Sequence, residues 1–197
     1  MSASAPARYT KTAIVLHWLI AVAAIAQITF GVWMNGIPKS PPGVRAYWFN
    51  VHKSIGITLA VLIVVRILWR LFHQAPPLPA TMPKWQRVAA KANHLLLYAC
   101  MIVMPVSGYL GSSFTKYPIL YWGIKLPQWG WDSPALKDLF SQIHYVTVII
   151  FIALIALHVA AALKHWLIDR DGIMRRMWFA PREAPVADIA PASAGAR

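Results

Sequence analysis

The chain has 197 residues, of which 58% are hydrophobic and 13% are charged, and its formal net charge is +13. An ordinary soluble domain carries about 25% charged residues, so the composition argues against a soluble protein. The apolar content excludes a disordered chain, and the single Cys100 excludes a disulfide scaffold. Nucleic-acid binding would explain the basic charge but not long apolar runs, so we expect an integral membrane protein with lipid, and no nucleic acid, as its partner.

The apolar residues fall into four runs, each long enough for a spanning helix, which needs about 20 mainly apolar residues. The expected helices cover about residues 12–34, 51–72, 88–111 and 139–167. Pro and Gly cluster between these runs, as they do in connecting loops. We expect an all-α, four-helix membrane bundle that forms one domain over residues 1–178. The Ala- and Pro-rich tail, residues 179–197, is expected to be disordered.

The first run could instead be a cleaved signal peptide, because Arg8 and Lys11 precede it and residues 24–26 resemble a cleavage site. Its apolar residues continue through Trp33, which is too long for the apolar core of a signal peptide. We therefore expect this helix to be retained.

Basic residues are distributed unevenly between the two sides of the expected bundle. With both termini on one side, that side holds thirteen Lys and Arg residues and the other side holds six. The positive-inside rule then predicts that both termini are cytoplasmic.

Four of the seven histidines lie well inside the apolar runs: His17, His52, His144 and His158. Polar residues at this depth are costly and are usually functional, although a single histidine could simply hydrogen-bond a neighbouring helix. His144 and His158 are fourteen residues apart, which places them within roughly 40° of one helical face and about 21 Å apart along the axis.

Chain direction then pairs the four histidines by depth. The first helix leaves the cytoplasm and the second and fourth return to it, so His17 matches His158 and His52 matches His144. Two stacked imidazole pairs indicate bis-histidine ligation of two haems, because a zinc site would gather its ligands around one point. No Cys-x-x-Cys-His motif occurs, so we expect two non-covalent haem b groups.

Several segments resemble bacterial cytochrome b561 and together span about residues 8–178. They are Leu16-His17-Trp18-Leu19, His52-Lys53-Ser54-Ile55-Gly56, the run from Val64 to Arg70, Pro105-Val106-Ser107-Gly108, and the run from Leu157 to His165. The resemblance implies a four-helix diheme protein that crosses the bacterial inner membrane and has the same four ligands. Within the family it is strongest to the superoxide-oxidising members. It therefore implies an enzyme that passes electrons from periplasmic superoxide through two haems to ubiquinone, releasing dioxygen. The same scaffold serves as the cytochrome b subunit of hydrogenases and other dehydrogenases, so a partner-fed subunit is the alternative.

Superoxide is an anion, and a cationic entrance would raise its rate of capture. The candidates on the periplasmic side are Lys53, beside His52, and three loop residues, Lys116, Lys125 and Lys137. These lysines could also be ordinary solvated charges or partners of haem propionates.

Two further histidines are candidates for the quinone site on the cytoplasmic side. His165 lies seven residues beyond His158, within roughly 20° of the same face. It could hydrogen-bond a quinone carbonyl and supply a proton, or it could face lipid headgroups. His94, expected where the third helix opens, could line the quinone site or a proton path, or hydrogen-bond another helix.

Arg66 and Arg70 share a helical face and could bind propionates of the cytoplasmic-side haem or reach toward lipid headgroups.

Overall fold

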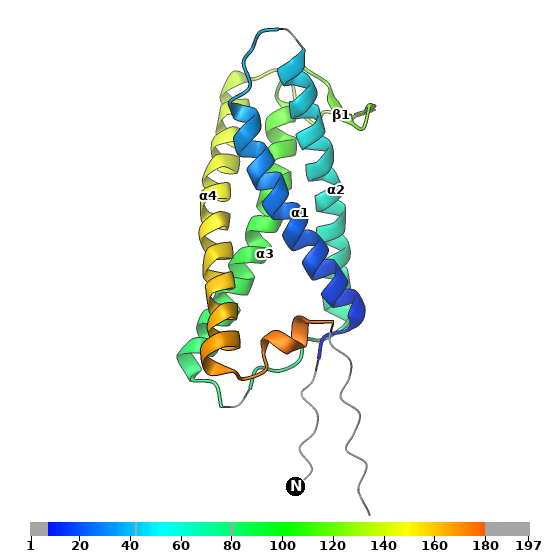
Figure 1. The fold of residues 1–197 in the computed structure, drawn as a ribbon. Coiled ribbons are helices and arrows are strands. Elements are labelled where there is room, and N and C mark those ends of the chain that lie inside the picture. The colour runs from blue at the N-terminus through cyan, green and yellow to red at the C-terminus, as the bar shows by residue number, and fades with distance from the viewer. Residues whose placement is uncertain (1–7, 42, 80, 180–197) are drawn as a thin grey trace, which may run out of the picture.

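Four long helices form the molecule in the computed structural model, which describes residues 8–41, 43–79 and 81–179. They are α1 (Lys11–Asn35), α2 (Val44–Phe72), α3 (Lys84–Ser113) and α4 (Pro134–Lys164). We call the end of the bundle where α1 begins and α4 ends the base, and the opposite end the top (Figure 1). Each helix is long and apolar enough to cross a membrane, so the predicted all-α architecture of four apolar helices is confirmed. The tail expected to be disordered lies almost entirely outside the described residues.

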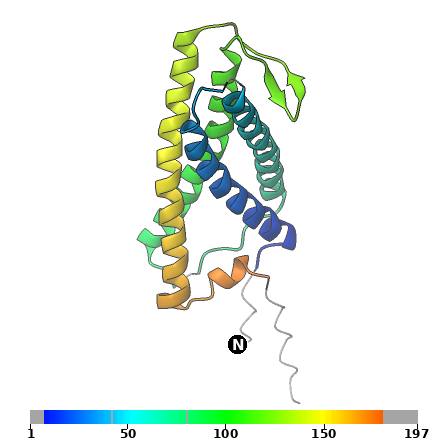
Figure 2. The same ribbon diagram turned by 45° about the horizontal axis from the view of Figure 1, so that its top comes forward.

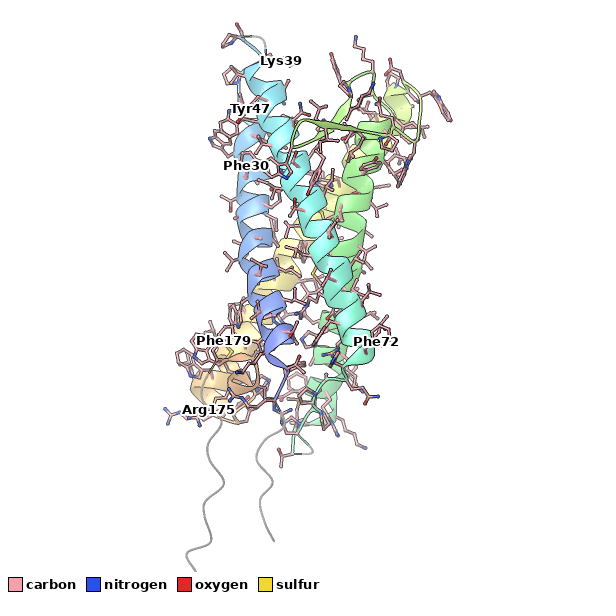
Figure 3. The ribbon with its side chains drawn as sticks, turned by 90° about the vertical axis from the view of Figure 1, so that its right-hand side faces the viewer. Phe30, Lys39, Tyr47, Phe72, Arg175 and Phe179 are labelled. Atoms are coloured by element: carbon pink, nitrogen blue, oxygen red, sulfur yellow. The ribbon has the colours of Figure 1, made fainter. Side chains whose placement is uncertain are left out.

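The bundle consists of two helical hairpins, because α1 packs mainly against α2 and α3 packs mainly against α4. Many large apolar side chains point outward, including Val22, Leu71 and Leu95, each at least 65% exposed. In a bilayer such side chains face lipid, which satisfies them as well as a protein core would. Figure 3 shows Lys39 at the top and Arg175 at the base, beyond the apolar middle of the helices.

The helices begin earlier in the chain than the apolar runs that predicted them. Helix α2 begins at Val44 rather than about residue 51, α3 at Lys84 rather than 88, and α4 at Pro134 rather than 139. Helical hydrogen bonding continues through polar residues until a start signal intervenes. For α4 that signal is the side chain of Ser133, which accepts a hydrogen bond from the backbone of Leu136 and precedes a proline in the first turn.

The fourth helix also ends earlier than expected, and the chain then turns back beneath the bundle. A π-helical turn, η1 (His165–Asp169), follows α4, and a short 3₁₀ helix, η2 (Met174–Met177), comes after it. The Trp18 indole N–H donates to the carbonyl of Met177 at 2.8 Å. This returning segment therefore closes the base below α1, as Figures 1 and 2 show in orange.

A two-stranded antiparallel hairpin, which the sequence reasoning missed, lies at the top beside α2 (Figure 2). It is formed by β1 (Ile119–Tyr121) and β2 (Ile124–Leu126), with Leu120 opposite Lys125. The Ser54 hydroxyl of α2 holds it, accepting from the backbone N–H of Trp122 at 3.0 Å and lying 3.2 Å from the carbonyl of Leu120. The strands are too short and too close to Pro and Gly residues for alternation to reveal them.

Candidate functional site

A first pair of histidines lies between the hairpins near the base. The rings of His17, from α1, and His158, from α4, have centroids 6.2 Å apart and planes inclined at 68°. Both side chains are half-buried. The pair lies near the starting end of α1 and the finishing end of α4, because the two helices run in opposite directions.

A second pair has nearly the same geometry near the top. The rings of His52, from α2, and His144, from α4, have centroids 6.4 Å apart and planes inclined at 77°. Helix α4 thus contributes one histidine to each pair, and the fourteen residues between them correspond to about 21 Å along its axis.

The separation of the rings suits an iron ion bound between them. Imidazole nitrogen binds first-row metals at about 2 Å and the ring centroid lies about 1 Å further away, so two opposed ligands have centroids about 6 Å apart. Both pairs match this value. In the described part of the chain, neither pair belongs to a group of three close metal-binding side chains, so neither fits a tetrahedral zinc site.

Hydrogen bonding prepares His144 as a ligand. Its Nδ1 lies 2.9 Å from the carbonyl oxygen of Met104 and 3.2 Å from the hydroxyl of Ser107, both in α3. A carbonyl oxygen only accepts, so Nδ1 carries the proton and donates, which leaves the lone pair of Nε2 free for a metal. Such outer partners orient a ligating histidine and raise its basicity.

Unlike His144, His52 has a buried ring nitrogen, Nδ1, without a hydrogen-bond partner among the described residues. The side-chain oxygen of Gln27 is also buried and unpaired, although the amide N–H₂ of Gln27 donates to the carbonyl of His52 at 2.7 Å. Buried polar atoms are rarely left unpaired, so this ring suits a bound group that the chain alone does not supply.

Two helical glycines make room for the rings of the top pair. A Cβ atom on Gly31 would lie 3.1 Å from Cε1 of His52, and one on Gly108 would lie 3.3 Å from Cε1 and Nδ1 of His144. Both distances are shorter than ordinary van der Waals contact, so the missing side chains allow these helices to approach the imidazoles. The sequence reasoning quoted Gly108 only as part of a family motif and did not consider Gly31.

The base pair has a third imidazole beside it. Helix α3 begins ten residues before His94, so this histidine does not open the helix as expected but lies within it. Its ring centroid is 5.3 Å from that of His158, which is shorter than the separation of two opposed iron ligands. His17, at 6.2 Å, is the better placed partner for His158.

Arg66 approaches the same region from α2. Its guanidinium lies 3.3 Å from Nδ1 of His17 and donates to the carbonyl of Ala13 at 3.2 Å. A shallow hollow between the helices is lined by both Arg66 and Arg70. The two guanidiniums therefore give the base pair a cationic neighbourhood that could bind the carboxylates of a cofactor.

His165 lies at the base, on the π-helical turn. Its Nδ1 is 2.6 Å from a carboxylate oxygen of Asp171 and 3.2 Å from one of Asp169. No hydrogen bond or ring contact joins His165 to the other quinone candidate, His94, in the described structure. Sequence reasoning missed both carboxylates. Asp169 is four residues from His165, a spacing that helical periodicity places on one face, so the sequence did hold a signal for it. The approach of Asp171 depends on a turn that helical periodicity does not describe.

The lysines proposed to attract superoxide all belong to segments at the top but differ in exposure. Lys53 follows His52 in α2 and is half-buried, whereas Lys116, Lys125 and Lys137 are exposed. Lys137 forms an ion pair of 2.7 Å with Asp138, so its charge is largely offset.

Comparison with known proteins agrees with this geometry. The model of the family described as prokaryotic cytochrome b561 matches residues 8–180. Cytochrome b561 homolog 2 of Escherichia coli K12 is 34% identical over 178 residues, which cover 87% of this chain and 92% of that protein. Cytochrome b561 homolog 1 of the same organism is 28% identical, covering 86% of this chain and 96% of that protein.

A protein of Yersinia pestis named a probable superoxide oxidase, CybB, is 25% identical, with 86% of this chain and 95% of that protein covered. This identity is below the 34% shared with homolog 2, so the resemblance is to the family and not to superoxide oxidases in particular. The chain belongs to the prokaryotic cytochrome b561 family and is a haem electron-transport protein that spans the bacterial inner membrane.

Proposed function

We propose that the chain holds two haem b groups and passes electrons from periplasmic superoxide through them to ubiquinone, releasing dioxygen. His17 and His158 would bind the haem near the base, and His52 and His144 the one near the top. The observation that carries the proposal is the pair of ring separations, 6.2 Å and 6.4 Å, at two levels of one bundle. Each haem, when bound, supplies a one-electron redox centre.

The excess of basic residues on the side of the termini supports a cytoplasmic base and a periplasmic top. Each superoxide gives up one electron and leaves as dioxygen. Two superoxide ions therefore reduce one ubiquinone, which also takes up two protons. The charges of Lys53, Lys116 and Lys125 at the top would attract the anion and raise its encounter rate.

At the base, His165 would hydrogen-bond a carbonyl oxygen of ubiquinone and donate a proton to it. General acids of this kind act within hydrogen-bond reach of the group they protonate. His94, which lies close to His158, would border the same region from α3. Arg66 and Arg70 would hold the propionates of the base haem.

The alternative is a cytochrome b subunit that takes its electrons from a docked dehydrogenase or hydrogenase. The exposed aromatic side chains of the α3–α4 connection favour it, because such residues are enriched at protein interfaces. They are Tyr117, Trp122, Trp129 and Trp131, each at least 59% exposed. The same residues would also suit an interfacial aromatic belt.

The test is a stopped-flow reaction of the purified, oxidised protein with superoxide, with and without a short-chain ubiquinone analogue. We expect fast, salt-sensitive haem reduction, followed by quinol formation when the analogue is present. Superoxide dismutase added beforehand should abolish both phases. Haems that are present but react slowly with superoxide would exclude the oxidase and favour the partner-fed subunit, which should then purify with its partner.

A further inference from the structure

The carboxylate of Asp171 fixes the orientation of the His165 ring. Its Oδ2 lies 2.6 Å from Nδ1 of His165, and its Oδ1 accepts a hydrogen bond of 3.1 Å from the backbone N–H of Ile173. Both oxygens are therefore held, one by the imidazole and one by the backbone. A carboxylate accepts at this contact, so Nδ1 donates and Nε2 is the nitrogen left for another partner.

The backbone conformation that produces this contact is unusual. His165 opens a π-helical turn, Arg170 has a left-handed conformation with φ of 51°, and Gly172 has φ of 77°. Together these residues reverse the chain, so that Asp171 returns against His165. Single π-helical turns and left-handed non-glycine residues are frequent at functional sites, where the surrounding structure must hold them in place.

The carboxylates of Asp169 and Asp171 differ in their charged partners. Asp169 lies 2.5 Å from the ammonium of Lys164 and 3.2 Å from Nδ1 of His165, so a fixed positive charge offsets it. Asp171 has no such ion pair with a lysine or arginine in the described structure. His165 and the two carboxylates are close enough to hold a cation, but the Lys164 ammonium already occupies that role at Asp169. Asp171 is thus the nearer carboxylate to Nδ1 of His165 and the one without a lysine partner.

Water reaches the carboxylates more readily than the ring. The side chain of His165 is 15% exposed and that of Asp171 is 28% exposed. A hollow of about 270 Å³ opens beside them, with both carboxylates in its wall. Its lining is Pro79, Thr81, Met82, Pro83, Gln86, Asp169 and Asp171. Protons from the solvent at the base can therefore enter through this hollow.

We propose that Asp171 is the positioning residue for protonation of the quinone, an inference that rests on the proposed reduction of ubiquinone. It holds the His165 ring through Nδ1–H and stabilises the imidazolium, so that Nε2–H points to the quinone oxygen. For one of the two protons, the Nε2–H bond breaks and an O–H bond forms on the carbonyl oxygen that faces His165, while the other quinone oxygen takes its proton from water. The quinone gains one electron per proton from the reduced protein. The ring is left neutral and hydrogen-bonded to Asp171, and the pair regains its proton from water in the hollow.

The test uses haem-loaded protein reduced chemically and freed of excess reductant, so that no superoxide is required. The reduced protein is mixed with a short-chain ubiquinone, and haem reoxidation and quinol formation are followed. General acid–base groups contribute about 10²- to 10⁴-fold, so Asp171→Asn should slow turnover at least about tenfold. The quinone KM and the equilibrium binding of the quinone to oxidised protein should stay within about threefold.

Two further variants separate positioning from a merely structural role. Asp138→Asn, a matched control at the top, should slow turnover less than about threefold, because that carboxylate pairs with Lys137 at the opposite end of the bundle from His165. Asp171→Ala should be as slow as Asp171→Asn, and added formate should restore much of its rate by supplying a small carboxylate beside His165.

The inference is wrong if Asp171→Asn reoxidises as fast as the parent protein. It is also wrong if both Asp171 variants lose quinone affinity together with rate and formate restores neither. If the parent protein itself is not reoxidised by ubiquinone, the proposed function fails at the acceptor, and that result is recognisable before any variant is made.

Discussion

Removing one histidine from one pair should remove one haem and leave the other. In His52→Ala the top site would lose one of the two histidines proposed to hold its haem, whereas the base pair lies about 21 Å away along α4, counted as fourteen residues at about 1.5 Å each. Effects of changes separated by more than about 10 Å are usually independent. We therefore expect the haem content to fall from about two per chain to about one. His158→Ala should remove the other haem and leave the top one.

The assay is the haem-to-protein ratio of the purified variants by pyridine haemochrome, together with the reduced-minus-oxidised spectrum of what remains. The two single variants should leave different spectra, which add up to that of the parent protein. His94→Ala is the sharpest control. The His94 ring is closer to His158 than the His17 ring is, but the separation is too short for two ligands on opposite sides of one iron ion. This variant should retain both haems.

The reasoning would be refuted by a folded His52→Ala or His158→Ala protein that keeps both haems or loses both. Loss of the base haem from His94→Ala, with retention in His17→Ala, would refute the assignment of His17 specifically. Circular dichroism of each variant shows whether the helices are intact, so that loss of haem is not confused with loss of fold.

Three further predictions concern charge and orientation. Arg66→Gln should lower the reduction potential of the base haem by about tens of millivolts, because the haem loses a nearby positive charge. A redox titration measures this potential, and an unchanged value would mean that the guanidinium is remote from the haem. Lys125→Glu should lower the rate constant for superoxide by about two- to fivefold at low salt, with the difference shrinking as salt is added. Lys125→Arg, which keeps the charge, should leave the rate constant unchanged, and equal effects of the two changes would contradict steering by this face. In intact cells, a membrane-impermeant maleimide should label Lys125→Cys but not Thr81→Cys, and the reverse labelling would invert the proposed orientation.

The architecture was predictable because its signals are local and long. Each spanning helix is an apolar run of about 20 residues, and its length alone decides between a membrane helix and a buried soluble one. The exact starts were not predictable, because hydropathy records where lipid begins and not where helical hydrogen bonding begins. Ser133, a helix cap well outside the apolar run of α4, illustrates the difference.

The proximity of each candidate histidine pair could also be argued from the sequence, through helix periodicity and chain direction. His144 and His158 share a face because fourteen residues are nearly a whole number of turns. The hydrogen bonds and close contacts that orient these rings could not be predicted, because they depend on packing between helices. Neither the hydrogen bond from His144 to the carbonyl of Met104 nor the room that Gly31 leaves for His52 follows from spacing along one helix.

The contacts of His165 at the base could not be predicted from helical periodicity alone. His165 was singled out because it continues the face of His158, but the α-helix ends at Lys164 and the ring belongs to a π-helical turn. Its partner Asp171 is six residues away, a spacing that places two side chains on different faces of a regular helix. The π-helical turn and the left-handed conformation at Arg170 together bring them to 2.6 Å. Because such a conformation is unfavourable for a non-glycine residue, it persists only when surrounding contacts hold it, and here the returning segment is tied to α1 through Trp18. Loosening that tie should therefore weaken the pairing of His165 with Asp171 without changing either residue.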